Sequence, residues 1–121
     1  MNTPRPAGWP VLIPRIVTGD VEGLVKFMKR VFGAKGRYRE DRPAEMLIGD
    51  SVVMISGLAG RRAMSAFLYL YVPDVDATYR RALKAGATSL EEPSEMPYGD
   101  RRAMIKDDWG NHWQIATYQR R

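Results

Sequence analysis

An internal repeat limits the folds open to this chain most strongly. Three pairs of segments correspond in order: Gly19-Asp20-Val21-Glu22 with Pro73-Asp74-Val75-Asp76, Gly33-Ala34 with Gly86-Ala87, and Gly49-Asp50-Ser51 with Gly110-Asn111-His112. A fixed order of motifs that recurs once along a chain indicates one supersecondary unit written twice. The chain must therefore fold as two similar halves.

Each half is predicted to be a β-α-β-β-β unit. Helices are predicted behind the N-cap residues Asp20 and Asp74, because apolar residues follow at helical spacing, and they end at Gly33 and Gly86. Alternating or apolar runs predict the strands, at residues 11–18, 37–41, 45–48, 52–56, 66–72, 88–91, 102–106 and 112–118. A helix covers one face of such a sheet and leaves the other bare, so the two units must pack or curl together. The predicted class is α+β.

With 121 residues, the chain is expected to form a single domain. We expect an N-terminal arm over residues 1–10, module one over about 11–57, a linker over about 58–64 and module two over about 65–118. The absence of cysteine excludes disulfides, zinc-thiolate sites and thiol nucleophiles. No apolar run approaches the roughly 18 residues of a membrane span, and no signal pattern is seen, so we expect a cytoplasmic protein without a membrane partner.

The charge of +5 comes from 19 basic and 14 acidic residues that interleave along the chain. A nucleic-acid-binding module would gather its excess charge on one face. We therefore expect no nucleic-acid partner, and a mild preference for anionic ligands.

Strand alternation predicts which side chains face the bare side of the second sheet. In the strand at 66–72, Leu68, Leu70 and Val72 suit packing under a helix, which places Phe67, Tyr69 and Tyr71 opposite. In the last strand, Trp113, Ile115 and Thr117 take the helix side, and His112, Gln114 and Ala116 the other. An aromatic face with a few polar tips suits a small-molecule cavity, although the same aromatics could fill a core or a dimer interface.

The repeat and its motifs together resemble the glyoxalase/bleomycin-resistance/dioxygenase proteins, the vicinal oxygen chelate superfamily. The motifs that carry the resemblance are Val31 to Ala34, Lys84 to Ala87, Ile48-Gly49-Asp50-Ser51, Val72-Pro73-Asp74-Val75-Asp76, Tyr98-Gly99-Asp100-Arg101 and Gly110-Asn111-His112-Trp113. The resemblance covers about residues 11–118. It implies two paired modules with their sheets curled into a U-shaped cavity, helices on the outer face, and usually a homodimer.

Metal-dependent members of that family hold a divalent ion with His and carboxylate side chains from the first and last strand of each module. The corresponding positions here are Ile13, Val53, Phe67 and Gln114. Three of these side chains cannot bind a cation, and Gln114 offers one neutral oxygen. We therefore expect no metal and no other cofactor.

Catalytic candidates are few. His112 lacks a second imidazole for a metal site, and none of the serines lies in a nucleophile-elbow pattern. The least implausible acid–base arrangement uses His112 as general base with Arg102 stabilising negative charge. The pair Asp107-Asp108 is expected to be solvated caps in a turn.

Three functions remain open from the sequence. The first is a metal-free homodimeric protein that sequesters an aromatic or anionic small molecule, as drug-resistance members of the family do. Its expected ligand-binding residues are Phe67, Tyr69, Gln114, His112, Tyr98, Arg102, Arg15 and Val53. The alternatives are a cofactor-independent lyase or isomerase in the same cavity, and a non-catalytic dimeric regulatory module.

Overall fold

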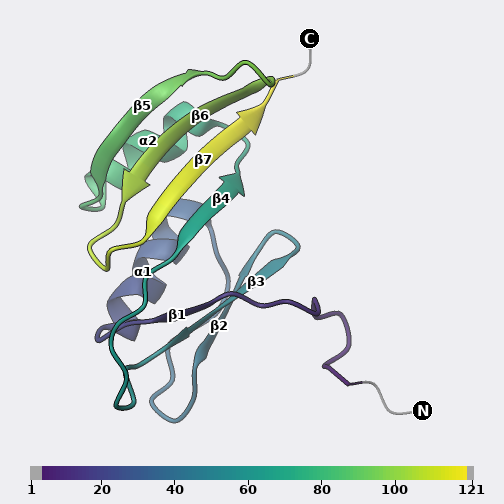
Figure 1. Ribbon diagram of the computed structural model, residues 1–121, viewed down its shortest axis with the longest axis vertical. Coiled ribbons are helices and arrows are strands. Elements are labelled where there is room, and N and C mark those ends of the chain that lie inside the picture. The colour runs from purple at the N-terminus through teal and green to yellow at the C-terminus, as the bar shows by residue number, and fades with distance from the viewer. Residues whose placement is uncertain (1–3, 120–121) are drawn as a thin grey trace. The chain divides into compact units, whose positions relative to one another are not determined.

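The computed structural model describes residues 4–119, which form two helices and seven strands. They divide into two compact units, the first over residues 4–29 and 33–64 and the second over 30–32 and 65–119. The elements are β1 (Arg15–Val17), α1 (Val21–Phe32), β2 (Ala44–Ile48), β3 (Ser51–Ser56), β4 (Phe67–Tyr71), α2 (Val75–Lys84), β5 (Thr88–Glu95), β6 (Asp100–Lys106) and β7 (His112–Tyr118). Two mixed sheets with two helices confirm the predicted α+β class (Figure 1). Residues 1–3 of the predicted arm lie outside the described residues.

The two sheets share one topology, with one strand fewer in the first. The first unit has the order β1-β3-β2, and the second has β4-β7-β6-β5. In both, the strand before the helix pairs in parallel with the last strand of the unit. The repeat read from the sequence is therefore real at the level of topology.

The strand predicted at residues 37–41 does not form. Only an isolated bridge between Lys35 and Leu47 stands where the first sheet would need a fourth strand. The run Arg39-Glu40-Asp41-Arg42 is charged throughout and precedes Pro43, which has no N–H to give to a ladder, so solvent is the better partner for this backbone.

The first strand is also shorter than predicted. It was expected over residues 11–18, but β1 begins at Arg15, and Val11 and Leu12 are more than four-fifths exposed. Pro14 precedes the strand and contributes only its carbonyl, which accepts from Met54 N. Conversely, β5 runs to Glu95 rather than Glu91, with two register shifts on a strand that contains Pro93.

The helix boundaries follow the predicted caps. Asp20 accepts a hydrogen bond from Gly23 N at 3.0 Å, and Asp74 accepts one from Ala77 N at 3.1 Å. Gly33 ends α1 in the left-handed region with φ of 66°, where glycine has no steric penalty. Helix α2 has Ala85 rather than Gly86 as its C-cap, and Gly86 follows with φ of 103°. On α2, Val75, Thr78 and Ala82 are buried, whereas Leu83 is exposed.

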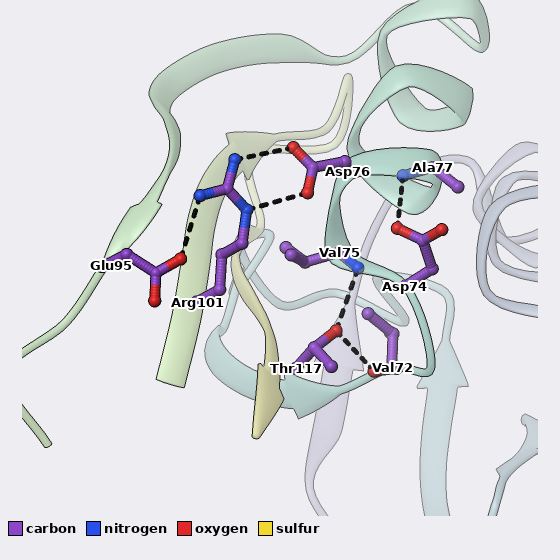
Figure 2. Close-up of polar contacts among 8 residues, drawn as sticks. All are labelled: Val72, Asp74, Val75, Asp76, Ala77, Glu95, Arg101 and Thr117. Atoms are coloured by element: carbon purple, nitrogen blue, oxygen red, sulfur yellow. Dashed lines mark hydrogen bonds and ion pairs between the residues drawn. The ribbon is translucent and has the colours of Figure 1, made fainter. Parts of the chain in front are cut away.

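The start of α2 is tied to its own sheet by polar side chains (Figure 2). Thr117 Oγ1 donates to Val72 O and accepts from Val75 N, so a residue of β7 joins both ends of the turn between β4 and α2. Arg101 of β6 donates to both oxygens of Asp76 in the first turn of the helix, at 2.8 and 3.0 Å, and to Glu95 of β5. These contacts fix which face of the second sheet the helix covers.

No helix among residues 4–119 is both long enough and apolar enough to cross a membrane.

Candidate functional site

The open face of the second sheet carries the predicted aromatic side chains. Trp113, Ile115 and Ile105 are fully buried on the side that α2 covers. On the other side Phe67 is 67% exposed, Tyr69 41% and Tyr71 60%, which confirms the alternation predicted for β4. An exposed edge strand with three aromatic rings on one face is uncommon for a strand that only closes a core.

The register orders the open-face side chains along the sheet. Phe67 lies opposite His112, Tyr69 opposite Gln114, and Tyr71 opposite Ala116. On the other side of β7, Met104 lies opposite Gln114, and Arg102 opposite Ala116. We call these residues, together with Asp100 and Tyr98, the open-face site. Its apolar end is the ring pair of Phe67 and His112, with centroids 5.9 Å apart in an edge arrangement.

Asp100 is the centre of the polar end, and the sequence reasoning missed it. Its side chain is 1% exposed, and its carboxylate accepts hydrogen bonds from Tyr69 at 2.5 Å and from Tyr71 at 2.9 Å. The alternation of Tyr69 and Tyr71 was visible in the sequence, but pairing them with Asp100 requires the β4-β7-β6 strand order, which the structure supplies.

The hydrogen bonds at the polar end run in one donor-to-acceptor direction, from Arg102 toward Asp100. Arg102 Nη1 donates to Tyr98 at 3.1 Å, and the hydroxyls of Tyr98 and Tyr69 are 3.2 Å apart. The hydroxyl of Tyr69 donates its hydrogen bond to Asp100, so Tyr98 must donate to Tyr69. A guanidinium and a buried carboxylate are thus joined through two phenols, and each phenol is held in one orientation.

Both tyrosines that contact Asp100 stay protonated more firmly than free tyrosine. Burial of the hydroxyl and the hydrogen bond to Asp100 raise the pKa of Tyr69. The hydrogen bond to Asp100 raises the pKa of Tyr71. Neither phenol is suited to act as a general base near neutral pH, and both act as hydrogen-bond donors.

Arg102 is the cation of the site. Its Nη2 donates to Glu91 at 3.1 Å and its Nη1 to Tyr98, while its Nε is buried and has no partner among residues 4–119. A buried donor without a partner costs free energy unless another acceptor reaches it. Arg101, by contrast, points to the helix side and is held by Asp76 and Glu95, so it is not available at the open face.

Two other predicted site residues, Arg15 and Val53, belong to the first unit. The Nε of Arg15 donates to Ser56 at 3.0 Å. Val53 is 6% exposed and shares a face of the first sheet with Met46 and Ile55, both fully buried. Neighbouring residues of a strand point to opposite faces, so an error of one residue in the assignment puts a side chain on the wrong face. The structure places Val53 in the core.

The turn before β7 corrects the expectation for Asp107. Its side chain is 3% exposed, and its carboxylate accepts from Asn111 and from Trp113 Nε1. Asp107 is a buried acceptor that shapes the turn, whereas Asp108 is exposed as expected.

The family's metal positions do not fit a divalent ion. Phe67 and Gln114 lie on the open face, where His112 is the single imidazole, and within the described part of the chain no three His, Cys, Asp or Glu side chains are grouped to hold a metal. Phenyl and aliphatic side chains offer no donor, and one amide oxygen is too weak a set.

A sequence model of the Glyoxalase/Bleomycin resistance protein/Dioxygenase superfamily matches residues 11–115. The chain belongs to this superfamily. The chain is similar to uncharacterized protein Mb0911c of Mycobacterium bovis, with 29% identity over 88% of this chain and 82% of that protein. Uncharacterized protein Rv0887c of Mycobacterium tuberculosis is also 29% identical, over 88% of this chain and 74% of that protein.

Solved structures share the fold of this chain. TioX from Micromonospora sp. ML1 superposes with a TM-score of 0.75 at 22% identity, covering 88% of this chain and 97% of TioX. A glyoxalase/bleomycin resistance protein/dioxygenase family enzyme from Burkholderia phytofirmans PsJN also gives 0.75, at 21% identity, with 88% and 96% covered. The resemblance inferred from the motifs is therefore confirmed.

Proposed function

We propose that this protein binds a small organic molecule with an aromatic ring on the open-face site, without the help of a metal. The observation that carries the proposal is the exposed aromatic face of β4 beside the guanidinium of Arg102, whose side chain is 19% exposed. A ring can pack on Phe67 and His112, while an acceptor on the same molecule takes a terminal N–H of Arg102. Gln114 lies between these two ends and can form a hydrogen bond with a polar group of the ligand.

The polar end is organised before any ligand arrives. Asp100 fixes Tyr69, Tyr69 fixes Tyr98, and Tyr98 holds Arg102 from one side as Glu91 does from the other. Side chains that are already ordered lose less entropy on binding, which favours affinity. Sequestration in the cytoplasm, as in drug resistance, requires only such affinity, and we propose that a homodimer performs it.

The enzymatic alternative gains little from the geometry. His112 and Arg102 lie at opposite ends of the site, since His112 pairs with Lys106 and Arg102 with Ala116. Four residues along β7 correspond to roughly 13 Å. These two side chains could contact opposite ends of one ligand, but they are poorly placed to act on the same bond.

The test is a thermal-shift screen of flat aromatic compounds with and without a carboxylate, followed by calorimetry on those that bind. We expect Phe67→Ala and Arg102→Gln each to weaken a hit by at least about tenfold. Leu47→Ala, which removes an exposed apolar side chain from a strand of the other unit, is the matched control and should bind normally. Unchanged affinity in both Phe67→Ala and Arg102→Gln would refute the site.

A further inference from the structure

The positive charge of the chain is not shared evenly between the two units. Among the described residues the first unit has ten Lys and Arg against six Asp and Glu, whereas the second has seven against eight. The excess of basic residues therefore lies in the first unit. Excess charge of this kind attracts anions.

Much of this excess lines one pocket. A cavity of about 350 Å³ in the first unit is bordered by Arg15, Arg39, Arg42 and Arg61, with Tyr38 at its wall. These arginines come from the start of β1, from the irregular segment before β2 and from the turn after β3. Three separate stretches of chain thus bring guanidinium groups to the same cavity.

The carboxylates in this pocket do not neutralise it. Glu40 and Asp41 also line the cavity, against the four arginines. The ion pair between Arg42 and Asp41 is 3.5 Å long, and both side chains are more than half exposed. Exposed pairs of this kind are weak and leave the arginine free to take a better partner.

Arg15 is the anchored member of the group. Its Nε donates to Ser56 Oγ at 3.0 Å, and Ser56 is 7% exposed at the end of β3. The strands β1 and β3 pair in parallel, so both ends of this hydrogen bond stand on regular structure. The bond occupies Nε alone, and the two terminal nitrogens of Arg15 can take both oxygens of an anion.

The turn that carries Arg61 holds an unusual backbone conformation. Arg61 N donates to Leu58 O at 2.8 Å, and the two residues between them, Ala59 and Gly60, have φ of 46° and 81°. Ala59 is the one residue other than glycine with positive φ in the described part of the chain. An L-residue in this region is strained, and such strain persists where the surroundings impose it, often at binding sites.

We propose that this pocket is a second binding site, which takes the phosphate group of a small phosphate monoester. Planar guanidinium groups match phosphate oxygens in pairs, and several of them together favour a dianion over a single carboxylate. The cavity has room for a phosphate with a small organic body. Glu40 and Asp41 can accept hydrogen bonds from hydroxyl groups on that body, and they disfavour a long polyanion such as nucleic acid.

The proposal is tested by calorimetry at fixed ionic strength with glycerol 3-phosphate, inorganic phosphate, glycerol and a short oligothymidylate. We expect glycerol 3-phosphate to bind more tightly than inorganic phosphate, and glycerol not to bind. Arg15→Gln and Arg61→Gln should each weaken glycerol 3-phosphate by about tenfold or more. Ser56→Ala should weaken it less, because it removes only the anchor of Arg15.

Arg30→Gln is the matched control, since it removes the same charge from an exposed position on α1 that does not line the pocket. Its affinity should stay within about twofold of the unchanged protein. Equal weakening by Arg30→Gln, tighter binding of the oligonucleotide than of glycerol 3-phosphate, or no binding of either phosphate would overturn the proposal. Arg61 lies in an exposed turn, so Arg61→Gln decides the matter even if Arg15→Gln fails to fold.

Discussion

The hydroxyl of Tyr69 on β4 donates a 2.5 Å hydrogen bond to the buried carboxylate of Asp100 on β6. These two strands do not pair directly, because β7 lies between them. The bond therefore crosses the sheet above Ala116, whose small side chain leaves room for it on the open face. The polar end of the open-face site depends on this crossing.

Removal of this donor should destabilise the protein. In Tyr69→Phe, Asp100 keeps Tyr71 but loses its shorter hydrogen bond while remaining buried. We expect the free energy of unfolding in urea to fall by about 1.5–3 kcal/mol, as is typical for a hydrogen bond to a charged group. Tyr98→Phe, whose hydroxyl does not contact Asp100, should cost about 0.5 kcal/mol. A loss in Tyr69→Phe no larger than in Tyr98→Phe would contradict this account.

The two phenols also predict a dependence on alkaline pH. The pKa values of Tyr69 and Tyr71 are raised in the folded protein, so folding holds their protons above the ordinary tyrosine pKa of about 10. Their contribution to stability is complete below that pH and is lost as pH rises toward the folded pKa values. Phenolate absorbance should show two of the six tyrosines ionising late. Asp100→Asn should bring both back toward ordinary values, and unchanged titration in this variant would count against the assignment.

The ion pair between Arg101 and Asp76 predicts the opposite behaviour in acid. The hydrogen bonds from Arg101 lower the pKa of Asp76, so the contribution of Asp76 is present above the ordinary carboxyl pKa of about 4 and is lost as pH falls through the folded value. Asp76→Asn should lower the urea midpoint at neutral pH, and the difference should shrink in acid. Arg101→Gln should cost less in the Asp76→Asn background than in the unchanged protein, because only its contact with Glu95 is then left to lose, and full additivity of the two changes would show that the pair does not couple.

Sequence alone predicted well where local chemistry decides the structure. Asp20 and Asp74 begin their helices because a carboxylate beside free N–H groups acts locally, and the alternation of β4 follows from the two-residue period of any strand. The absence of a fourth strand in the first sheet could not be predicted in this way. The sequence at residues 37–41 favours an extended backbone, but a strand forms only where a neighbouring strand pairs with it. The backbone of the charged segment around Glu40 is better hydrogen-bonded by water.

The candidate sites depend on strand order and on which irregular segments meet. Neither can be inferred from short stretches of the sequence. Asp100 could not be chosen from sequence as the partner of Tyr69, since the two are 31 residues apart and joined only through β7. The four arginines of the pocket looked dispersed for the same reason. Val53 was assigned through the internal repeat, but in the first sheet it pairs with Met46 and lies on the buried side.

Asp107 is a buried hydrogen-bond acceptor, although the sequence suggested a solvated cap. Its carboxylate accepts from the backbone of Trp109 and Asn111, from the Asn111 side chain and from Trp113 Nε1, with 2.8 Å for the last of these. Asp107→Ala removes the acceptor of the buried Asn111 and Trp113 side chains, and each unsatisfied buried group costs about 1–3 kcal/mol. We expect unfolding in urea to show a loss of about 3 kcal/mol or more. Asp108→Ala changes the adjacent exposed carboxylate and should stay within about 0.5 kcal/mol, so equal losses in the two variants would contradict the buried role of Asp107.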